Sequence, residues 1–263
     1  MHYISFGRGA VPLVIIPGLN DGQRTVKGSG PILAYFYRSF ARHYRVWVFS
    51  RRNELKHGMT TRDMAADQAD AMEQLGLNQA MVMGVSQGGM IAQWLAADHP
   101  EKIERLVLVI TLARQNETLE RVVGSWIDMA LGGRFGELAV DMVEKTFTGK
   151  YLRRMRPFYW LIRKTGKPVS IDRFLIQARS CLSHDAYQSL GRIVSPTLVI
   201  GGGGDQIVGG AAVQEELAGA IAGSSLIVYP GLGHGAYAEA PDFGPRILEF
   251  LGKSAEPEEH VRS

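Results

Sequence analysis

Six short apolar runs, separated by longer amphipathic segments, constrain the fold of this chain more than any other feature. They are almost continuous in Val, Ile, Leu and Met, which indicates strands buried on both faces, as in a parallel sheet. The intervening segments are long enough for helical crossovers. The runs are Pro12–Pro17, Arg45–Ser50, Ala80–Gly84, Arg105–Ile110, Thr197–Gly202 and Ser225–Pro230. We therefore expect an α/β fold with a mostly parallel, doubly wound sheet.

Helical periodicity between the runs supports this fold. Apolar residues recur at helical spacing, and Thr60 with Asp63 resembles the capping box that starts a helix. The predicted helices follow Pro31, run through 64–75, 90–97 and 211–221, and follow Pro241.

One section breaks the alternation of strands and helices. From Ala113 to Gly191 the pattern is helical, with no convincing strand. Its candidate helices are 117–131, 135–147, 151–164 and 171–182. We expect a core domain formed by 1–112 and 192–253, a helical insertion at 113–191, and a polar tail at 254–263.

Composition bounds the class of protein. The chain has 263 residues, 46% hydrophobic and 21% charged, as in ordinary soluble globular proteins. Its one cysteine, Cys181, excludes an internal disulfide and a paired-cysteine metal site, and we expect it to be buried. The first residues, MHYISFGRGA, lack the pattern of a secretion signal, and no apolar run reaches the ~20 residues of a membrane span. We expect a cytoplasmic protein, a monomer or a homodimer, with no stable membrane insertion.

The net charge of +3 has a local origin. Eight Lys/Arg and one Asp lie between Gly149 and Arg173. A solvated helical surface is the favoured interpretation. Attraction of an anionic substrate or membrane surface stays open. No recognised nucleic-acid-binding motif accompanies the segment, so we expect no nucleic-acid partner.

The segment AMVMGVSQGGM places a serine on a tight turn between a strand and a helix. Gly84, Ser86 and Gly88 form the Gly-x-Ser-x-Gly pattern of a nucleophile elbow. The serine of such a turn has a strained backbone, so its neighbours two residues away must be small. The N-terminus of the following helix favours negative charge developing at the same place. We interpret Ser86 as a nucleophile.

A serine alcohol needs a base, and the base needs a carboxylate that orients it. In chain order the elbow is followed by the acid and then the histidine. Asp205 directly follows the fifth apolar run and His234 follows the sixth, so both lie at carboxyl ends of strands. We predict the triad Ser86, Asp205 and His234. Less suitable alternatives are Asp128, Asp141, Asp242 and His260.

Acyl transfer also needs donors for the oxyanion. The backbone N–H of Gln87, after the nucleophile, is one predicted donor. The loop PGLNDG after the first run supplies the other, the N–H of Leu19, and Gly18 permits close approach. We expect neither a metal nor an organic cofactor.

Together these motifs resemble the α/β-hydrolase family, in its capped branch of esterases, lactonases, C–C hydrolases, perhydrolases and dehalogenases. The resemblance runs from about Pro12 to Leu251, through Pro-Gly-Leu, Gly-Val-Ser-Gln-Gly-Gly, Gly-Gly-Gly-Asp and Gly-His. Pro17 stands where the branch usually has histidine, and Gly209 where proline is common. SRRNELKHG, from Ser50, replaces the usual Asp-x-x-Gly-x-Gly. Ser86 disfavours dehalogenase activity, because dehalogenases use an aspartate nucleophile.

The resemblance implies that the insertion is a cap that covers the nucleophile and shapes its pocket. The residues expected to bind substrate there are Trp126, Met129, Phe158, Tyr159 and Trp160. We expect a serine hydrolase that cleaves a carboxylic ester or lactone of a small-to-medium apolar substrate through an acyl-enzyme. C–C hydrolysis, perhydrolysis or acyl transfer on the same triad stays open. A low-turnover ligand receptor or signalling protein of this fold also stays open.

Overall fold

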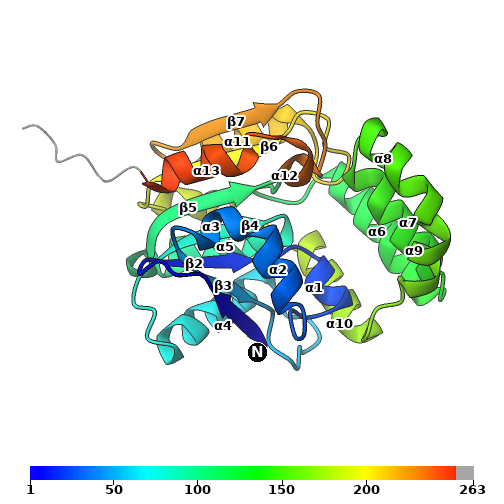
Figure 1. Ribbon diagram of the computed structural model, residues 1–263, viewed down its shortest axis with the longest axis horizontal. Coiled ribbons are helices and arrows are strands. Elements are labelled where there is room, and N and C mark those ends of the chain that lie inside the picture. The colour runs from blue at the N-terminus through cyan, green and yellow to red at the C-terminus, as the bar shows by residue number, and fades with distance from the viewer. Residues whose placement is uncertain (253–263) are drawn as a thin grey trace, which may run out of the picture.

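A seven-stranded sheet forms the centre of the structure, a computed structural model that describes residues 1–252 (Figure 1). The strand order is β1-β3-β2-β4-β5-β6-β7, and every neighbouring pair except β1 and β3 is parallel. The strands are β1 (Tyr3–Phe6), β2 (Pro12–Ile16), β3 (Arg45–Phe49), β4 (Ala80–Val85), β5 (Ile103–Val109), β6 (Thr197–Gly202) and β7 (Ser225–Tyr229). The six predicted strands are β2 to β7, so the parallel sheet is confirmed. The predicted polar tail, 254–263, lies outside the described residues.

Strand β1 was not predicted. It pairs antiparallel with β3 at the edge of the sheet, with Tyr3 opposite Phe49 and Phe6 opposite Val46. Its four residues are exposed or half-buried rather than fully buried. A search for continuous apolar runs detects strands covered on both faces and misses a short edge strand of this kind.

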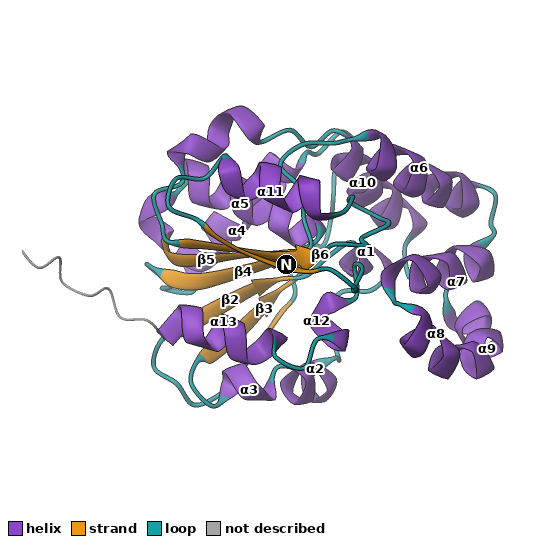
Figure 2. Cartoon of the chain, turned by 90° about the horizontal axis from the view of Figure 1, so that it is seen from above, coloured by secondary structure: helices purple, strands orange, loops and turns teal. Residues whose placement is uncertain are grey.

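Helices cover both faces of the sheet (Figure 2). On one face lie α4 (Thr61–Gln74), α5 (Gln87–Asp98) and α11 (Ala211–Gly219), and on the other α2 (Gly30–Phe36), α3 (Arg38–Ala41) and α13 (Phe243–Gly252). Two hydrophobic clusters, one for each face, fill the space between helices and strands. Thr60 and Asp63 form the predicted capping box at the start of α4, with both reciprocal bonds present. The helix predicted after Pro31 divides at Tyr37 into α2 and α3.

Segment 113–191 is helical and lies between β5 and β6 in the chain. It contains α6 (Glu117–Leu131), α7 (Phe135–Thr146), α8 (Gly149–Met155), α9 (Tyr159–Thr165) and α10 (Ile171–Leu182). Figure 1 shows α6 to α9 beside the carboxyl ends of the strands. The single helix predicted for 151–164 is wrong: the 3-10 turn η2 (Arg156–Phe158) separates α8 from α9. The reason is Pro157, which has no N–H to donate and clashes with the preceding turn of a helix.

A third hydrophobic cluster joins α6 and α10 to the carboxyl edge of the sheet. Leu119 and Trp126 of α6 and Phe174 of α10 pack there with Leu19 and Met90. The remaining short elements are α1 (Asn20–Gln23), η1 (Pro100–Lys102), η3 (Tyr187–Arg192) and α12 (Ala236–Glu239). None of the helices within residues 1–252 is both long enough and apolar enough to span a bilayer.

Candidate active site

Ser86 lies on a strained turn between β4 and α5. Its backbone has φ 55° and ψ −119°, a conformation that costs a non-glycine residue free energy. Gly88 makes this turn possible, because a Cβ at that position would lie 1.9 Å from the carbonyl oxygen of Ile16. The elbow therefore presses against the end of β2, and its glycine spacing has a steric cause.

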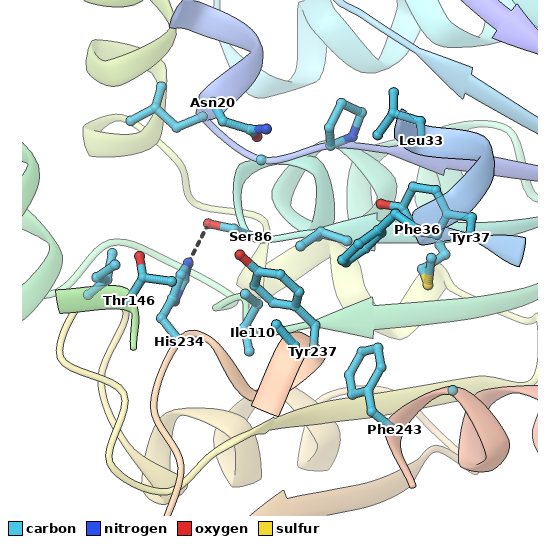
Figure 3. Close-up of a pocket in the computed structure, with 18 of the residues that line it drawn as sticks. Asn20, Leu33, Phe36, Tyr37, Ser86, Ile110, Thr146, His234, Tyr237 and Phe243 are labelled. Atoms are coloured by element: carbon cyan, nitrogen blue, oxygen red, sulfur yellow. Dashed lines mark hydrogen bonds between the residues drawn. The ribbon is translucent and has the colours of Figure 1, made fainter. Parts of the chain in front are cut away.

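The structure brings the three predicted triad residues into one hydrogen-bonded chain. His234 Nε2 lies 2.9 Å from Ser86 Oγ (Figure 3), and His234 Nδ1 lies 2.7 Å from Asp205 Oδ2. Ser86 follows the carboxyl end of β4, Asp205 that of β6 and His234 that of β7. His234 and Asp205 are both buried, so the chain is shielded from water along most of its length.

The Asp205 carboxylate is held by the backbone as well as by the histidine. Its Oδ1 accepts the N–H groups of Ile207 at 2.8 Å and Val208 at 3.1 Å, which leaves Oδ2 aimed at the ring. Gly202 lets the acid loop and the histidine loop meet, because a Cβ there would lie 2.3 Å from the Gly233 carbonyl oxygen. The acid loop and the histidine loop are therefore in close backbone contact at this position.

The other candidate acids have different partners. Asp242 has a half-exposed side chain and accepts from Arg246 Nε at 3.2 Å. Asp141 accepts from Trp126 Nε1 at 2.7 Å and is paired with Lys145. Asp128 lies on α6, outside the hydrogen-bonded chain of Ser86. The fourth alternative, His260, lies outside the described residues.

The predicted oxyanion loop turns tightly against the elbow. Asp21 N donates to Gly18 O and Gly22 N donates to Leu19 O, and these bonds start α1. A Cβ on Gly18 would lie 3.2 Å from Ser86 Cβ, so the loop passes close to the serine. The α1 helix was not predicted. The donor roles of Leu19 and Gln87 stay a prediction.

Ser86 and His234 open into a cavity of about 920 Å³, near the upper end of the usual range for small-molecule sites. Its walls come from both the sheet domain and the helical segment. They include Leu19, Ile32, Leu33, Phe36, Tyr37, Met90, Ile110, Leu119, Val123, Trp126, Met142, Tyr151, Ile207, Tyr237 and Phe243. The lining is mostly apolar, and Ser86 and His234 are among its polar residues.

The chain's relatives are consistent with this arrangement. A family model described as the alpha/beta hydrolase fold matches residues 11–241. The chain is an α/β-hydrolase. It is 26% identical over 247 residues to a Caulobacter sp. (strain K31) protein whose name describes a carbamate hydrolase, RutD, with 87% of this chain and 88% of that protein covered.

Solved structures share the fold of this α/β-hydrolase over nearly its whole length. MGS-M2, an alpha/beta hydrolase enzyme from a Medee basin deep-sea metagenome library, superposes with a TM-score of 0.86 at 20% identity, covering 98% of this chain and 96% of that one. The enol-lactonase from Burkholderia xenovorans LB400 superposes with a TM-score of 0.80 at 24% identity, covering 96% of each chain. At these identities the likeness concerns the fold.

Four of the five residues expected to line the hydrolase pocket do not line it. Trp126 is in the cavity wall, but Met129, Phe158, Tyr159 and Trp160 are not. Phe158 and Trp160 are 55% and 66% exposed, and both lie at or just after the turn that contains Pro157. Met129 packs against the third hydrophobic cluster.

Residues that the sequence did not single out complete the wall opposite. Tyr237 follows the histidine loop on α12, and Phe36 and Tyr37 come from α2 and its end (Figure 3). Ile110 follows β5 with φ 45°, an uncommon conformation for a β-branched residue. Its left-handed backbone lies at a strand end next to the elbow, where Ser86 N donates to Val109 O.

A buried arginine behind the elbow of the hydrolase was also missed. Arg51 follows β3 and is fully buried, and its Nη2 donates to Pro17 O at 2.5 Å and to Gln87 Oε1 at 2.9 Å. Burial lowers the pKa of Arg51 to about 10, against the opposing effect of Asp21. Two departures from the family pattern, Pro17 and the segment after Ser50, therefore contact each other.

The contacts of Arg51 extend into a network that reaches α10. Asp21 Oδ2 accepts Arg51 N at 3.1 Å and Arg173 Nη2 at 2.5 Å. Gln87 Nε2 donates to Gln177 O at 2.7 Å. The elbow, the predicted oxyanion loop and α10 are thus joined by buried polar contacts, which no single sequence motif encodes.

The remaining titratable group of note in the cavity wall is Cys181. It is buried, as predicted, and burial raises the pKa of its thiol to about 12. A thiol of this kind is protonated at neutral pH and is a poor nucleophile. Within residues 1–252, no three His, Cys, Asp or Glu side chains are grouped so that they could hold a metal ion.

Proposed function

We propose that this protein is a serine hydrolase that cleaves carboxylic esters or lactones through an acyl-enzyme. The observation that carries the proposal is the continuous hydrogen-bonded chain from Asp205 through His234 to Ser86, in the wall of a mostly apolar cavity. A nucleophile hydrogen-bonded to a base, with the base oriented by a third group, is the arrangement that acyl transfer requires.

In the proposed acylation step, Ser86 Oγ attacks the carbonyl carbon while His234 Nε2 takes the hydroxyl proton. Asp205 keeps Nδ1 protonated, so that Nε2 is free to accept, and stabilises the imidazolium that forms. The tetrahedral oxyanion receives hydrogen bonds from the N–H groups of Leu19 and Gln87. Collapse of this intermediate expels the alcohol, which takes the proton back from His234.

In the second step a water molecule attacks the acyl group on Ser86. His234 takes a proton from this water, the acid is released, and Ser86 Oγ recovers its proton from the histidine. The strained backbone at Ser86 supports both steps, because the turn projects Oγ away from its own chain. No step needs a metal ion or a redox cofactor.

We also assign segment 113–191 the role of a cap. Leu119, Val123 and Trp126 of α6 and Met142 of α7 contribute to the cavity wall, so the segment shapes the space available to the substrate. Apart from Thr146 and Tyr151 its contribution is apolar, which favours a small-to-medium apolar group next to the reacting carbonyl. The sheet domain contributes the nucleophile, acid and base.

The test is the turnover of p-nitrophenyl esters, lactones and carbamates by the wild-type protein and by Ser86→Ala. A carbamate belongs in the panel because of the name of the Caulobacter relative. We expect Ser86→Ala to lose hydrolysis and labelling by a fluorophosphonate probe while unfolding at the wild-type urea concentration. The matched control is Ser225→Ala, at an exposed position on β7. Wild-type turnover in Ser86→Ala contradicts the proposal, and binding without turnover by the wild type favours a receptor.

A further inference from the structure

The charge of the cavity wall is one-sided. The charged residues of the lining are Arg38 and Arg42, and none of the lining residues described is an aspartate or glutamate. A cavity with low-dielectric walls and charge of one sign attracts ligands of the opposite sign. The positive charge can distinguish anionic substrates from uncharged ones of the same shape, which the apolar wall alone does not distinguish.

Within residues 1–252, no carboxylate neutralises either arginine. Arg38 Nη1 donates to the carbonyl oxygen of Tyr35 at 2.9 Å, and its guanidinium lies 4.4 Å from the centre of the Tyr35 ring. Neither contact supplies a negative charge. Among residues 1–252 no carboxylate forms an ion pair with Arg38, and the Arg42 side chain has no hydrogen bond or ion pair. Each guanidinium keeps N–H donors for a ligand.

A third arginine strengthens this cationic region. Arg38 and Arg42 also line a neighbouring hollow of about 660 Å³, and Arg8 lies in the wall of that hollow. Arg8 N donates to Ala41 O, which holds the N-terminal segment against α3. We call Arg38 and Arg42 the arginine pair, and Arg8 lies next to it.

The arginine pair lines the same cavity as Ser86, next to the wall formed by Phe36 and Tyr37. Figure 3 shows the wall running from Ser86 and His234 past Tyr237 to Phe36, Tyr37 and Phe243. Arg38 follows Tyr37 directly in the chain, and Arg42 is the C-terminal capping residue after α3. An apolar stretch therefore separates the nucleophile from the cations, and a substrate that contacts both must be amphiphilic.

We propose that the arginine pair binds a carboxylate at the far end of the substrate. The substrate class is an ester or lactone with an apolar chain that places a terminal carboxylate away from the reacting carbonyl. This inference deepens the proposed ester hydrolysis and depends on it. It predicts discrimination by charge at a point distant from the triad, where uncharged and cationic analogues of equal length are disfavoured.

The expected discrimination is moderate, because both arginines are exposed. Ion pairs in contact with water are weakened by hydration and by salt, so we expect a preference of about fivefold rather than several orders of magnitude. The preference is electrostatic and must shrink as the ionic strength rises. A purely steric preference has no such dependence on salt.

The experiment compares esters that differ only in the distal charge. The first series is the mono-p-nitrophenyl esters of adipic, suberic and sebacic acid, each beside its methyl-capped analogue. The second series, ω-acetoxyalkanoates beside their methyl esters, places the carboxylate on the alcohol part. The readout is the ratio of kcat/KM for the acid to kcat/KM for its methyl-capped partner, in which a general loss of activity cancels.

The variants are Arg38→Gln, Arg42→Gln, the double variant and the charge reversal Arg42→Glu. We expect the wild-type ratio to exceed one in at least one series, to approach one in the double variant, and to fall below one in Arg42→Glu. Arg121→Gln, an exposed position on α6 outside the cavity lining, is the control that keeps both rates. A wild-type ratio of one in both series, or a ratio unchanged in the double variant, overturns the proposal.

A binding measurement separates this proposal from the proposed activity. In Ser86→Ala, calorimetry compares methyl hydrogen suberate with dimethyl suberate, and no turnover is needed. Tighter binding of the monoacid, lost in the Ser86→Ala protein that also carries both glutamine substitutions, supports the carboxylate site even if no ester is hydrolysed. Equal binding of the two ligands overturns it, whether or not Ser86 proves to be the nucleophile.

Discussion

Arg51 Nη2 bonds both the side-chain oxygen of Gln87 and the carbonyl oxygen of Pro17, at 2.9 Å and 2.5 Å. Gln87 follows the serine of the elbow, and Pro17 precedes the loop that contains Leu19. One buried cation thus connects the two segments whose N–H groups are proposed to bind the oxyanion. We therefore expect the spacing of these two segments to depend on this contact as well as on the elbow itself.

Replacing Arg51 by methionine tests this connection. We expect a loss of about 1–3 kcal/mol in the free energy of unfolding, because the buried oxygens of Pro17 and Gln87 lose their donor. We also expect kcat for a p-nitrophenyl ester to fall more than KM changes, since the oxyanion is bound in the transition state. Urea unfolding and steady-state kinetics measure the two effects.

The matched control for Arg51→Met is Arg52→Met. Arg52 is the next residue, is half-exposed and pairs with Asp67. We expect the Arg52→Met variant to keep wild-type kcat. If Arg51→Met also keeps wild-type kcat and the wild-type urea midpoint, the connection has no role in positioning.

Replacing Asp205 by asparagine keeps the shape of the carboxylate but removes its charge. His234 then loses the partner that keeps Nδ1 protonated, and the imidazolium of the transition state loses its stabilising anion. We expect kcat to fall by about 100-fold or more, with KM changed much less. Asp242→Asn, at a half-exposed residue bonded to Arg246, is the control and should keep wild-type kcat. Comparable losses in the two variants speak against Asp205 as the acid of the triad.

Two glycine-to-alanine substitutions should have opposite effects on stability. Gly88→Ala places a Cβ 1.9 Å from Ile16 O, so the elbow and β2 must separate, and we expect the variant to be strongly destabilised. Gly124 lies inside α6 with open space where a Cβ would be. Gly124→Ala should therefore raise the free energy of unfolding by about 0.5–1 kcal/mol. Urea midpoints measure both, and a stable Gly88→Ala protein refutes the steric account of the elbow.

His184 predicts how stability depends on pH. Burial lowers its pKa from 6.5 to about 3, and its Nδ1 lies 2.8 Å from Thr61 Oγ1. Between these pKa values the unfolded chain binds a proton that the folded protein does not, so stability falls as the pH drops below about 6.5. The loss has a limiting slope of about 1.4 kcal/mol per pH unit.

The measurement is the free energy of unfolding in urea between pH 7 and pH 4. His184→Asn should show a smaller slope than the wild type, whatever its absolute stability. The exposed His57→Asn should leave the slope unchanged. Parallel curves for the wild type and His184→Asn would show that His184 is not the source of the acid sensitivity.

The sequence by itself determined the parallel strands, most helix positions and the order of serine, acid and histidine. These features are local: a buried strand needs a continuous apolar run, and the elbow needs Gly84 and Gly88 two residues from Ser86. Strand-end positions then place Asp205 and His234 on the same edge as the serine. Edge strand β1 was not predicted because it has no buried apolar run. The break at Pro157 was not predicted because it interrupts an otherwise helical pattern.

Only the tertiary structure decided which residues surround Ser86. Trp160 carries the apolar character expected of a pocket residue and lies exposed, whereas Phe36 and Tyr237, distant in the chain, form the wall. Arginine is usually a surface residue, but Arg51 is fully buried between Pro17 and Gln87. Side-chain burial depends on how separate segments pack against one another, and this packing produces no periodic pattern in the amino-acid sequence.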